Sequence, residues 1–222
     1  MNNVSVIIPA HNEEKSIKKV IDSISKSIHN LEVIVMDNCS NDNTFEVAQK
    51  CGAKVYSCTK KGKGYAMEMG LEYATNEILV FIDADIITEN NIIDILVEPI
   101  IDRKVDFVKS TFDRINGGIV TEIATKPLLN ILYPEMYNFS EPLSGMIASK
   151  KSVLEKIQFE KDYGVDIGIL LDVIKMKLQV EEVNIGRIEN MSHLNKTTQI
   201  MKDMSIEIMK CILKKSKFEN NL

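Results

Sequence analysis

Residues 78–85 read Ile78-Leu79-Val80-Phe81-Ile82-Asp83-Ala84-Asp85, an apolar run that ends in two carboxylates one residue apart. The run predicts a buried β-strand, and ligands of open α/β sheets bind just outside the carboxyl ends of such strands. Hard divalent cations prefer oxygen ligands and often bridge carboxylates to substrate phosphates. Asp83 and Asp85 therefore predict a Mg²⁺ or Mn²⁺ clamp on a nucleotide diphosphate. The alternative is a helix N-cap beside a solvated neighbour, ahead of the apolar stretch 92–97.

The first hundred residues alternate between short apolar runs and helical patterns. Strands are predicted at residues 4–8, 31–36, 55–56 and 78–82. Between them we expect helices, the first of them capped by Asn12 and with an apolar face that runs from Ile17 to Ile28. Near-continuous apolar strands separated by helices are typical of a parallel sheet that is covered on both faces. We therefore expect an α/β fold with a mostly parallel central sheet and helices on both faces.

The second half of the chain is less regular. The patterns predict further strands at residues 107–110, 145–148 and 180–185, and further helices at residues 121–132, 150–157, 165–176 and 197–214. No linker-like composition or internal repeat separates the halves. We expect one domain over residues 1–222, with a nucleotide-binding half at 1–105 and an acceptor-binding half at 106–222 that ends in the C-terminal helix.

Composition narrows the class of protein. The chain has 222 residues, 45% of them hydrophobic, and a formal net charge of −5, which gives no general attraction to nucleic acid. No uncharged apolar stretch approaches the ~18 residues that would predict a transmembrane helix. The sequence opens on a strand at Val4, which leaves no room for a signal peptide. Four cysteines without a Cys-x-x-Cys spacing fit a reducing compartment, so we expect a cytoplasmic protein.

Polar loops follow the predicted strand ends at four places. They are residues 9–14, 37–38, 62–64 and 83–85. Each loop alone can be explained as a turn or a helix cap, with Lys63 as a solvated side chain. Because the carboxyl ends of parallel strands meet at one edge of a sheet, however, the four loops are expected to converge. Their joint occurrence favours a binding site.

The chemistry of these loops suits a nucleotide diphosphate. A carboxylate such as Asp37 can accept a hydrogen bond from the imide N–H of a pyrimidine, and the backbone of residues 9–11 can frame the base. Lys63 and the helix N-terminus at Gly64 favour phosphate. A cation held by Asp85 would neutralise the charge that accumulates on a departing diphosphate.

Two sets of motifs resemble a known family. Residues 6–14 (VIIPAHNEE), residues 35–44 (VMDNCSNDNT) and the Asp-x-Asp resemble the family 2 glycosyltransferases of GT-A fold, which is a Rossmann-like fold for nucleotide-diphospho-sugar transferases. The later segments that resemble the glucosyl-3-phosphoglycerate synthases of this family are 112–114 (FDR), 117–122 (GGIVTE), 126–129 (KPLL), 142–145 (PLSG) and 163–168 (YGVDIG).

The resemblance implies a metal-dependent, retaining hexosyltransferase. Its donor would be a UDP- or GDP-activated sugar, with UDP favoured, and its acceptor would be a small molecule that is phosphorylated in the related enzymes. Mn²⁺ or Mg²⁺ is the implied cofactor. We also expect a second copy of the chain as a partner, in a homodimer.

Site residues follow from the resemblance position by position. The residues implied at the nucleotide sugar are Pro9, Ala10, His11, Glu13, Asn38, Lys63, Asp83, Ala84 and Asp85, to which the chemical argument adds Asp37. Asp83, Asp85 and His193 are the implied metal ligands. Gly118, Thr121 and Asn195 are the implied acceptor-binding residues.

The chain departs from the family at two positions. The related enzymes have an Arg that grips the acceptor phosphate after the paired glycines, whereas this chain has Ile119. They have a Glu after Leu-x-Gly, whereas this chain has Met146. An apolar side chain cannot replace the bidentate hydrogen bonds of Arg. The departures leave the donor site intact and put the acceptor in question.

Three catalytic residues are expected. Lys63 and Asp85, through its metal, would stabilise the leaving diphosphate. Asp166 would be the base if the enzyme inverted configuration, and the alternative for Asp166 is a helix cap. Two rival functions remain, namely a polyprenyl-phosphate glycosyltransferase, which would need a face for the membrane, and a non-catalytic nucleotide-sugar-binding protein.

Overall fold

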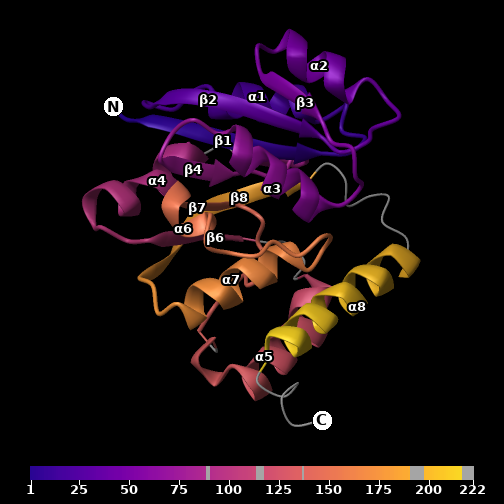
Figure 1. Ribbon diagram of the computed structural model, residues 1–222, viewed down its shortest axis with the longest axis vertical. Coiled ribbons are helices and arrows are strands. Elements are labelled where there is room, and N and C mark those ends of the chain that lie inside the picture. The colour runs from indigo at the N-terminus through magenta and orange to yellow at the C-terminus, as the bar shows by residue number, and fades with distance from the viewer. Residues whose placement is uncertain (89–90, 114–117, 137, 191–197, 217–222) are drawn as a thin grey trace.

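The computed structural model describes residues 1–88, 91–113, 118–136, 138–190 and 198–216. Its centre is an eight-stranded sheet in the order β3-β2-β1-β4-β7-β6-β8-β5 (Figure 1). The strands are β1 (Asn3–Ala10), β2 (Asn30–Asp37), β3 (Lys54–Ser57), β4 (Ile78–Phe81), β5 (Ile86–Thr88), β6 (Phe107–Asp113), β7 (Ile147–Lys150) and β8 (Val180–Asn190).

The sheet is parallel in its first half and mixed in its second. β1 pairs in parallel with β2 and β4, and β2 pairs in parallel with β3. In the second half β7 runs antiparallel to both β4 and β6, β6 is parallel to β8, and β5 is antiparallel to β8. The expected α/β fold is confirmed, and the parallel pairing is concentrated in the half that was expected to bind the nucleotide.

Helices cover both faces of the sheet. They are α1 (Ile17–Ile24), α2 (Thr44–Lys50), α3 (Lys63–Tyr73), α4 (Ile92–Asp102), α5 (Lys126–Leu132), α6 (Lys151–Leu154), α7 (Val165–Lys175) and α8 (Thr198–Lys215). Because successive strand residues point to opposite faces, Ile7 packs with α3, α5, α7 and α8, while Val6 and Ile8 pack with α1, α2 and α4. The two faces each hold an apolar core.

Apart from shifts of up to five residues at the ends of β6, β7, β8 and α6, three differences between the predicted elements and the structure stand out. α1 ends at Ile24, so Ile28 lies outside the helix and is 64% exposed. The short strand β5 was not predicted, because three residues carry little periodicity. The helix predicted at 121–132 is a π-helical turn, η1 (Val120–Thr125), followed by α5, with the Lys126 N–H donating to the Thr121 carbonyl. Pro127 has no N–H to donate, which fits a widened turn at this point.

Among the described residues, no helix is both long enough and apolar enough to cross a membrane. A short 3₁₀ turn, η2 (Pro134–Met136), completes the elements that follow α5.

Candidate active site

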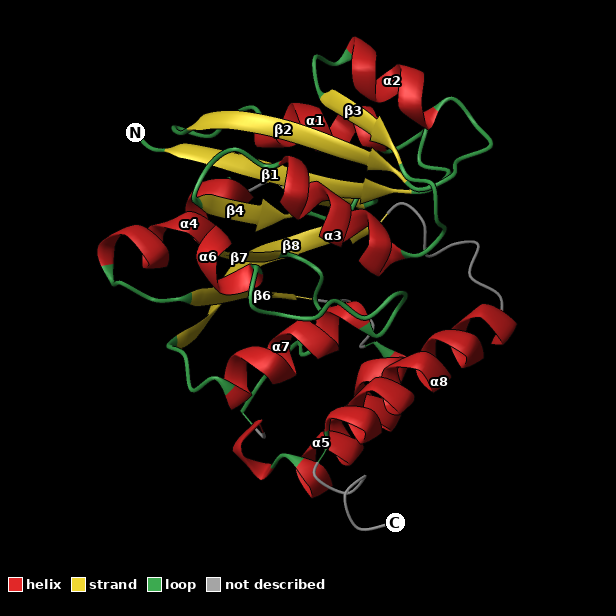
Figure 2. Cartoon of the chain, in the orientation of Figure 1, coloured by secondary structure: helices red, strands yellow, loops and turns green. Residues whose placement is uncertain are grey.

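The carboxyl ends of β1 to β4 reach one edge of the sheet, on the right-hand side of Figure 2. The loops that follow them are joined there by hydrogen bonds. The Asn38 N–H donates to the Ala10 carbonyl over 2.7 Å, and the Cys58 N–H donates to the Asp37 carbonyl over 2.8 Å. The structure therefore brings the predicted loops together at the edge where ligands of parallel sheets bind.

The loop after β1 is fixed against the loop after β2. The ring of His11 donates from Nδ1 to the Asn38 carbonyl over 2.8 Å. Asn12 has a positive φ of 59° and accepts a hydrogen bond from the Asn41 N–H over 2.8 Å. The prediction that Asn12 caps α1 is wrong, because the N-cap of α1 is Ser16, four residues later, and the helix begins at Ile17. The Asn12 amide instead ties the two loops together.

The other predicted residues of this loop contribute in different ways. Pro9 is half-buried at the end of β1, and Ala10 is 2% exposed and offers mainly its backbone. Glu13 accepts from the Ser16 hydroxyl over 2.6 Å, and its N–H donates to the Thr44 hydroxyl over 2.7 Å. Glu13 therefore connects the start of α1 to the start of α2, beside the region that was expected to frame the base.

Asp37 and Asn38 are both buried at the end of β2. The Oδ1 atom of Asp37 is buried and has no hydrogen-bond partner among the residues that the structure describes. A buried acceptor without a donor is costly, so the group fits a ligand that supplies one. Both polar atoms of the Asn38 amide are engaged, because Nδ2 donates to the Gly62 carbonyl over 2.6 Å and Oδ1 accepts from the Gly62 N–H over 2.9 Å.

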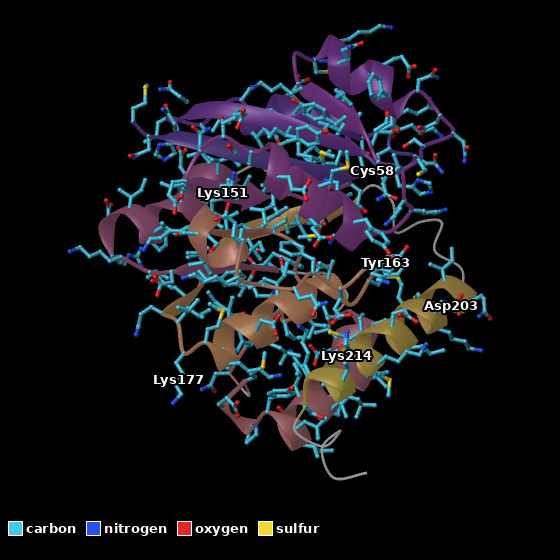
Figure 3. The ribbon with its side chains drawn as sticks, in the orientation of Figure 1. Cys58, Lys151, Tyr163, Lys177, Asp203 and Lys214 are labelled. Atoms are coloured by element: carbon cyan, nitrogen blue, oxygen red, sulfur yellow. The ribbon has the colours of Figure 1, made fainter. Side chains whose placement is uncertain are left out.

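Gly62 and Gly64 are required by close packing. A Cβ atom on Gly64 would overlap the backbone carbonyl of Glu160, and the Gly64 N–H donates to the Lys161 carbonyl over 3.1 Å. That N–H is therefore occupied, contrary to its expected use as a phosphate donor. The segment from Glu160 to Tyr163, the latter labelled in Figure 3, lies against the start of α3 and holds Lys63 in place.

Lys63 lies between two carboxylates. Its ammonium nitrogen is 2.8 Å from Asp83 Oδ1, after β4, and 2.8 Å from Asp166 Oδ2, in the first turn of α7. Burial disfavours the charged amine, but Asp166 and Asp83 outweigh burial and raise the pKa of Lys63. The ammonium is thus kept charged at the strand ends, where a diphosphate would need it.

Asp166 is not a helix cap. Gly164 occupies the N-cap position of α7, and the Asp166 carboxylate turns to Lys63. Burial raises the pKa of Asp166 above its ordinary value, although the positive charge of Lys63 opposes that effect. Its Oδ1 atom is buried without a hydrogen-bond partner among the described residues.

The Asp-x-Asp carboxylates suit a hard cation. Ala84 is 4% exposed, while Asp83 and Asp85 on either side are half-buried. Two carboxylates at a rim, completed by substrate oxygens, are the donor set that Mg²⁺ and Mn²⁺ prefer. Within the described part of the chain no three His, Cys, Asp or Glu side chains form a metal cluster. The predicted third ligand, His193, lies outside the described residues.

A buried polar group that sequence reasoning missed lies beside these carboxylates. Lys109 of β6 has no exposed surface and donates to the Ser144 carbonyl over 2.7 Å. Gly145 follows, and a Cβ atom there would overlap Lys63 Nζ and lie 2.6 Å from Asp83 Oδ1. The signal in the sequence is a lysine in the otherwise apolar start of a predicted strand.

The acceptor residues are less completely described. The Gly118 carbonyl accepts from the Glu122 N–H over 2.9 Å, and Thr121 is 3% exposed in η1. Ile119 beside them is 62% exposed. Met146 is 1% exposed and packs in the core on the α1, α2 and α4 face, so it does not substitute for a sugar-binding side chain. Asn195 lies outside the described residues.

Comparisons with known proteins agree with this geometry. A family model described as Glycosyl transferase family 2 matches residues 5–157. The chain is 34% identical over 237 residues to the glucosyl-3-phosphoglycerate synthase of Mycobacterium tuberculosis (strain CDC 1551 / Oshkosh), which covers 95% of this chain and 72% of that relative.

Solved structures of the M. tuberculosis synthase are similar as well. One, in complex with Mn²⁺, UDP-glucose and phosphoglyceric acid, has a TM-score of 0.87 at 34% identity and covers 96% of this chain and 79% of its own. Another, in complex with Mg²⁺ and UDP, has a TM-score of 0.87 at 33% identity with the same shares covered.

Proposed function

This chain belongs to glycosyl transferase family 2 and is a glycosyltransferase, and from that premise we propose that it transfers a hexose from a UDP-sugar to a small acceptor. UDP-glucose is the first donor to consider, because the related synthase was solved with it. The expected family, fold and enzyme class are confirmed. The assignment of residues 1–105 to the donor and 106–222 to the acceptor is part of the proposal.

The observation that carries the proposal is the position of Lys63. Its ammonium is 2.8 Å from Asp83, which belongs to the Asp-x-Asp of the donor half, and 2.8 Å from Asp166 of the other half. Two buried carboxylate oxygens, on Asp37 and Asp166, have no partner among the described residues. They suit two donors that a UDP-sugar and its acceptor bring, namely the uracil imide and a sugar or acceptor hydroxyl.

The residues present fit a divalent metal. Asp83 and Asp85, with His193, would hold Mn²⁺ or Mg²⁺, and the related synthase was solved with Mn²⁺ and UDP-glucose and with Mg²⁺ and UDP. When bound, the ion supplies Lewis-acid stabilisation of the leaving diphosphate. Through that ion, the carboxylate pair at the strand end would hold the diphosphate at the edge of the sheet.

Lys63 and Asp166 make two further contributions to the reaction. Lys63 places a fixed positive charge beside the diphosphate, where negative charge develops as the glycosidic bond breaks. Asp166 accepts a hydrogen bond from a hydroxyl and fixes its position. If configuration is retained, as in the enzymes that this chain resembles, a diphosphate oxygen takes the acceptor proton. Asp166 is then an orienting group, whereas in an inverting reaction it would be the base.

The acceptor is proposed to carry less negative charge than 3-phosphoglycerate. Ile119 stands where the resemblance places an Arg, and it points an exposed apolar side chain at the start of η1. Gly118 and Thr121 remain. A backbone N–H can attract an anion at this turn, but the side chain of Ile119 supplies no charge-assisted fork.

We also propose a cytoplasmic homodimer. The four cysteines are free thiols, which fits a reducing compartment.

The proposed dimer contact lies on α8. Exposed apolar side chains recur there at i, i+3 and i+7, at Ile206, Met209 and Leu213, each 38–48% exposed. A stripe of this kind suits burial against a second copy. Light scattering after gel filtration tests it, and a monomer at micromolar concentration would contradict it.

Turnover of nucleotide sugars tests the proposed function. The protein is incubated with UDP-glucose, GDP-glucose and ADP-glucose, with Mn²⁺ or EDTA, and with 3-phosphoglycerate, glycerate and glycerol as acceptors. We expect metal-dependent UDP release and a glycosylated product detected by mass spectrometry. Lys63→Met should abolish it, while Lys61→Met, at an exposed neighbour, should not. UDP-glucose binding without release or product would instead support a non-catalytic binding protein.

A further inference from the structure

Lys109 is buried at a cost in stability. It lies in β6 with no exposed surface, and its ammonium donates to the Ser144 carbonyl over 2.7 Å. Lysine is almost never fully buried unless it is paired, and a buried charge costs free energy even when it is paired. Burial lowers the pKa of Lys109 to about 8. The free energy that this burial costs points to a functional role for Lys109.

The hydrogen bonds around Lys109 fix one short segment. The hydroxyls of Ser110 and Ser144 are 2.5 Å apart, and the Ser144 hydroxyl accepts from the Met146 N–H over 3.3 Å. The Ser110 N–H donates to the Met146 carbonyl over 3.0 Å. Together with the Lys109 contact, these bonds hold residues 144–146 against β6.

The middle residue of that segment borders the active site. Gly145 lies so close to Lys63 and Asp83 that a Cβ atom would overlap the ammonium and lie 2.6 Å from Asp83 Oδ1. The backbone of Gly145 is therefore a wall of the site. Any shift of the Ser144 carbonyl moves this wall relative to the Lys63–Asp83 pair.

The charge of Lys109 also faces the active site. The ionisable groups that act on it are Asp166 from α7, Lys63 from α3, Glu182 from β8 and Asp83 after β4. Lys63 pairs directly with both carboxylates of the site, and the charge of Lys109 acts on them from a longer distance. A diphosphate that attracts Lys63 would leave Lys109 to balance the buried charge of Asp166.

We propose that Lys109 is a positioning residue of the transfer reaction, which holds the Ser144–Gly145 wall against Lys63 and Asp83 and balances the charge of Asp166. The inference rests on the proposed function. Lys109 contacts neither the base-binding loops nor the Asp-x-Asp through a hydrogen bond among the described residues. Its loss should therefore affect the turnover number more than the binding of UDP.

The test compares Lys109→Met with Lys151→Met. Lys151 donates to the Ala74 carbonyl over 2.7 Å, so the control removes a similar bond (its position is labelled in Figure 3). The first readout is kcat and KM for UDP release from UDP-glucose with Mn²⁺, without an acceptor. The second is the Tm of the metal-free proteins. For Lys109→Met we expect kcat to fall at least tenfold, KM to stay within threefold, and Tm to stay within about 2 °C of native or rise.

Lys151→Met should keep kcat within twofold. A native kcat in Lys109→Met would overturn the proposal. A Tm lowered by more than about 5 °C together with the lost activity would also overturn it, because Lys109 would then be a structural residue only.

A second measurement separates this inference from the proposed function. Because the charges of Lys109 and Asp166 interact, the change in Tm caused by Lys109→Met should be more positive in an Asp166→Asn background than in the native one, by at least about 2 °C. This readout needs no turnover. If the native protein releases no UDP, the proposed function fails, and the Tm cycle alone decides on Lys109. Additive changes in Tm would reject the charge balance.

Discussion

The side chain of Asn38 and the backbone of Gly62 bind each other twice, through Nδ2 to the Gly62 carbonyl at 2.6 Å and from the Gly62 N–H to Oδ1 at 2.9 Å. Asn38 was expected beside the base of the nucleotide. Its amide also closes the turn that precedes Lys63. The residue thereby links the end of β2 to the loop that places the ammonium between Asp83 and Asp166.

Asn38→Asp should break one of the two bonds. A carboxylate can accept from the Gly62 N–H, but it cannot donate to the Gly62 carbonyl. We expect a loss of about 1–3 kcal/mol in the free energy of unfolding, the cost of an unsatisfied buried group. Urea denaturation measures it. Asn41→Asp adds the same charge at an exposed position and is the control. Equal stability of the two variants would show that the paired bonds contribute nothing.

Asp85→Asn should weaken UDP binding that depends on Mn²⁺. Asp85 is half-buried after β4, and the loss of one proposed carboxylate ligand should weaken the metal site, so we expect at least a tenfold loss, about 1.4 kcal/mol. His193→Ala should behave alike. Asp22→Asn, at a side chain that is 58% exposed, is the matched control. Calorimetric titration with UDP measures the loss, and equal affinity in EDTA would contradict the metal site.

UDP should bind more tightly than ADP. The buried Oδ1 atom of Asp37 lacks a partner among the described residues, and uracil offers an imide N–H where adenine does not. The expected difference is about 1–3 kcal/mol, the cost of an unpaired buried acceptor. Titration with both nucleotides in Mn²⁺ measures it. Asp37→Ala should reduce the preference, and equal affinity of the native protein for ADP would refute this role of Asp37.

Gly145→Ala should impair turnover without unfolding the protein. The added methyl group would overlap Lys63 Nζ and approach Asp83 Oδ1 to 2.6 Å, so the ammonium must move away from the site. We expect at least a tenfold lower rate of UDP release from UDP-glucose. The circular dichroism spectrum should stay native. An unchanged rate would mean that Lys63 can move without consequence for the reaction.

Glu32 should make stability depend on acid pH. Burial opposes its charge, but hydrogen bonds from Lys54, Ser5 and Thr75 lower its pKa to about 2 from 4.5. Because the folded-state pKa is depressed, the stabilisation is present above pH 4.5 and is lost as the pH falls toward 2. Glu32→Gln should lower stability at pH 7 by about 1–3 kcal/mol and converge with the native protein near pH 2–3. Glu72→Gln, at an exposed residue, is the control and should not lower stability at pH 7.

Several features could be predicted because they depend on local patterns. The apolar runs of β1, β2 and β4 predicted buried parallel strands, since a strand covered on both faces excludes polar residues. The loops after them were predicted to meet, since parallel strands share an edge. The prediction that Asn12 caps a helix was wrong. Its amide accepts a hydrogen bond from Asn41, 29 residues later in the chain, and sequence periodicity does not report contacts of this kind.

The sequence by itself determined the order of most strands and helices, with β5 as an exception, and also the polar loops at the strand ends and the kinds of side chain available for a nucleotide sugar. These follow from periodicity and from residue chemistry, which act over a few residues. Only the tertiary structure decided that Asp166 meets Lys63, 103 residues earlier, and that Lys109 donates to the carbonyl of Ser144, which precedes Gly145. Such pairs are set by how helices and strands pack across the sheet, and the burial and charge that they create exist only once the chain is folded.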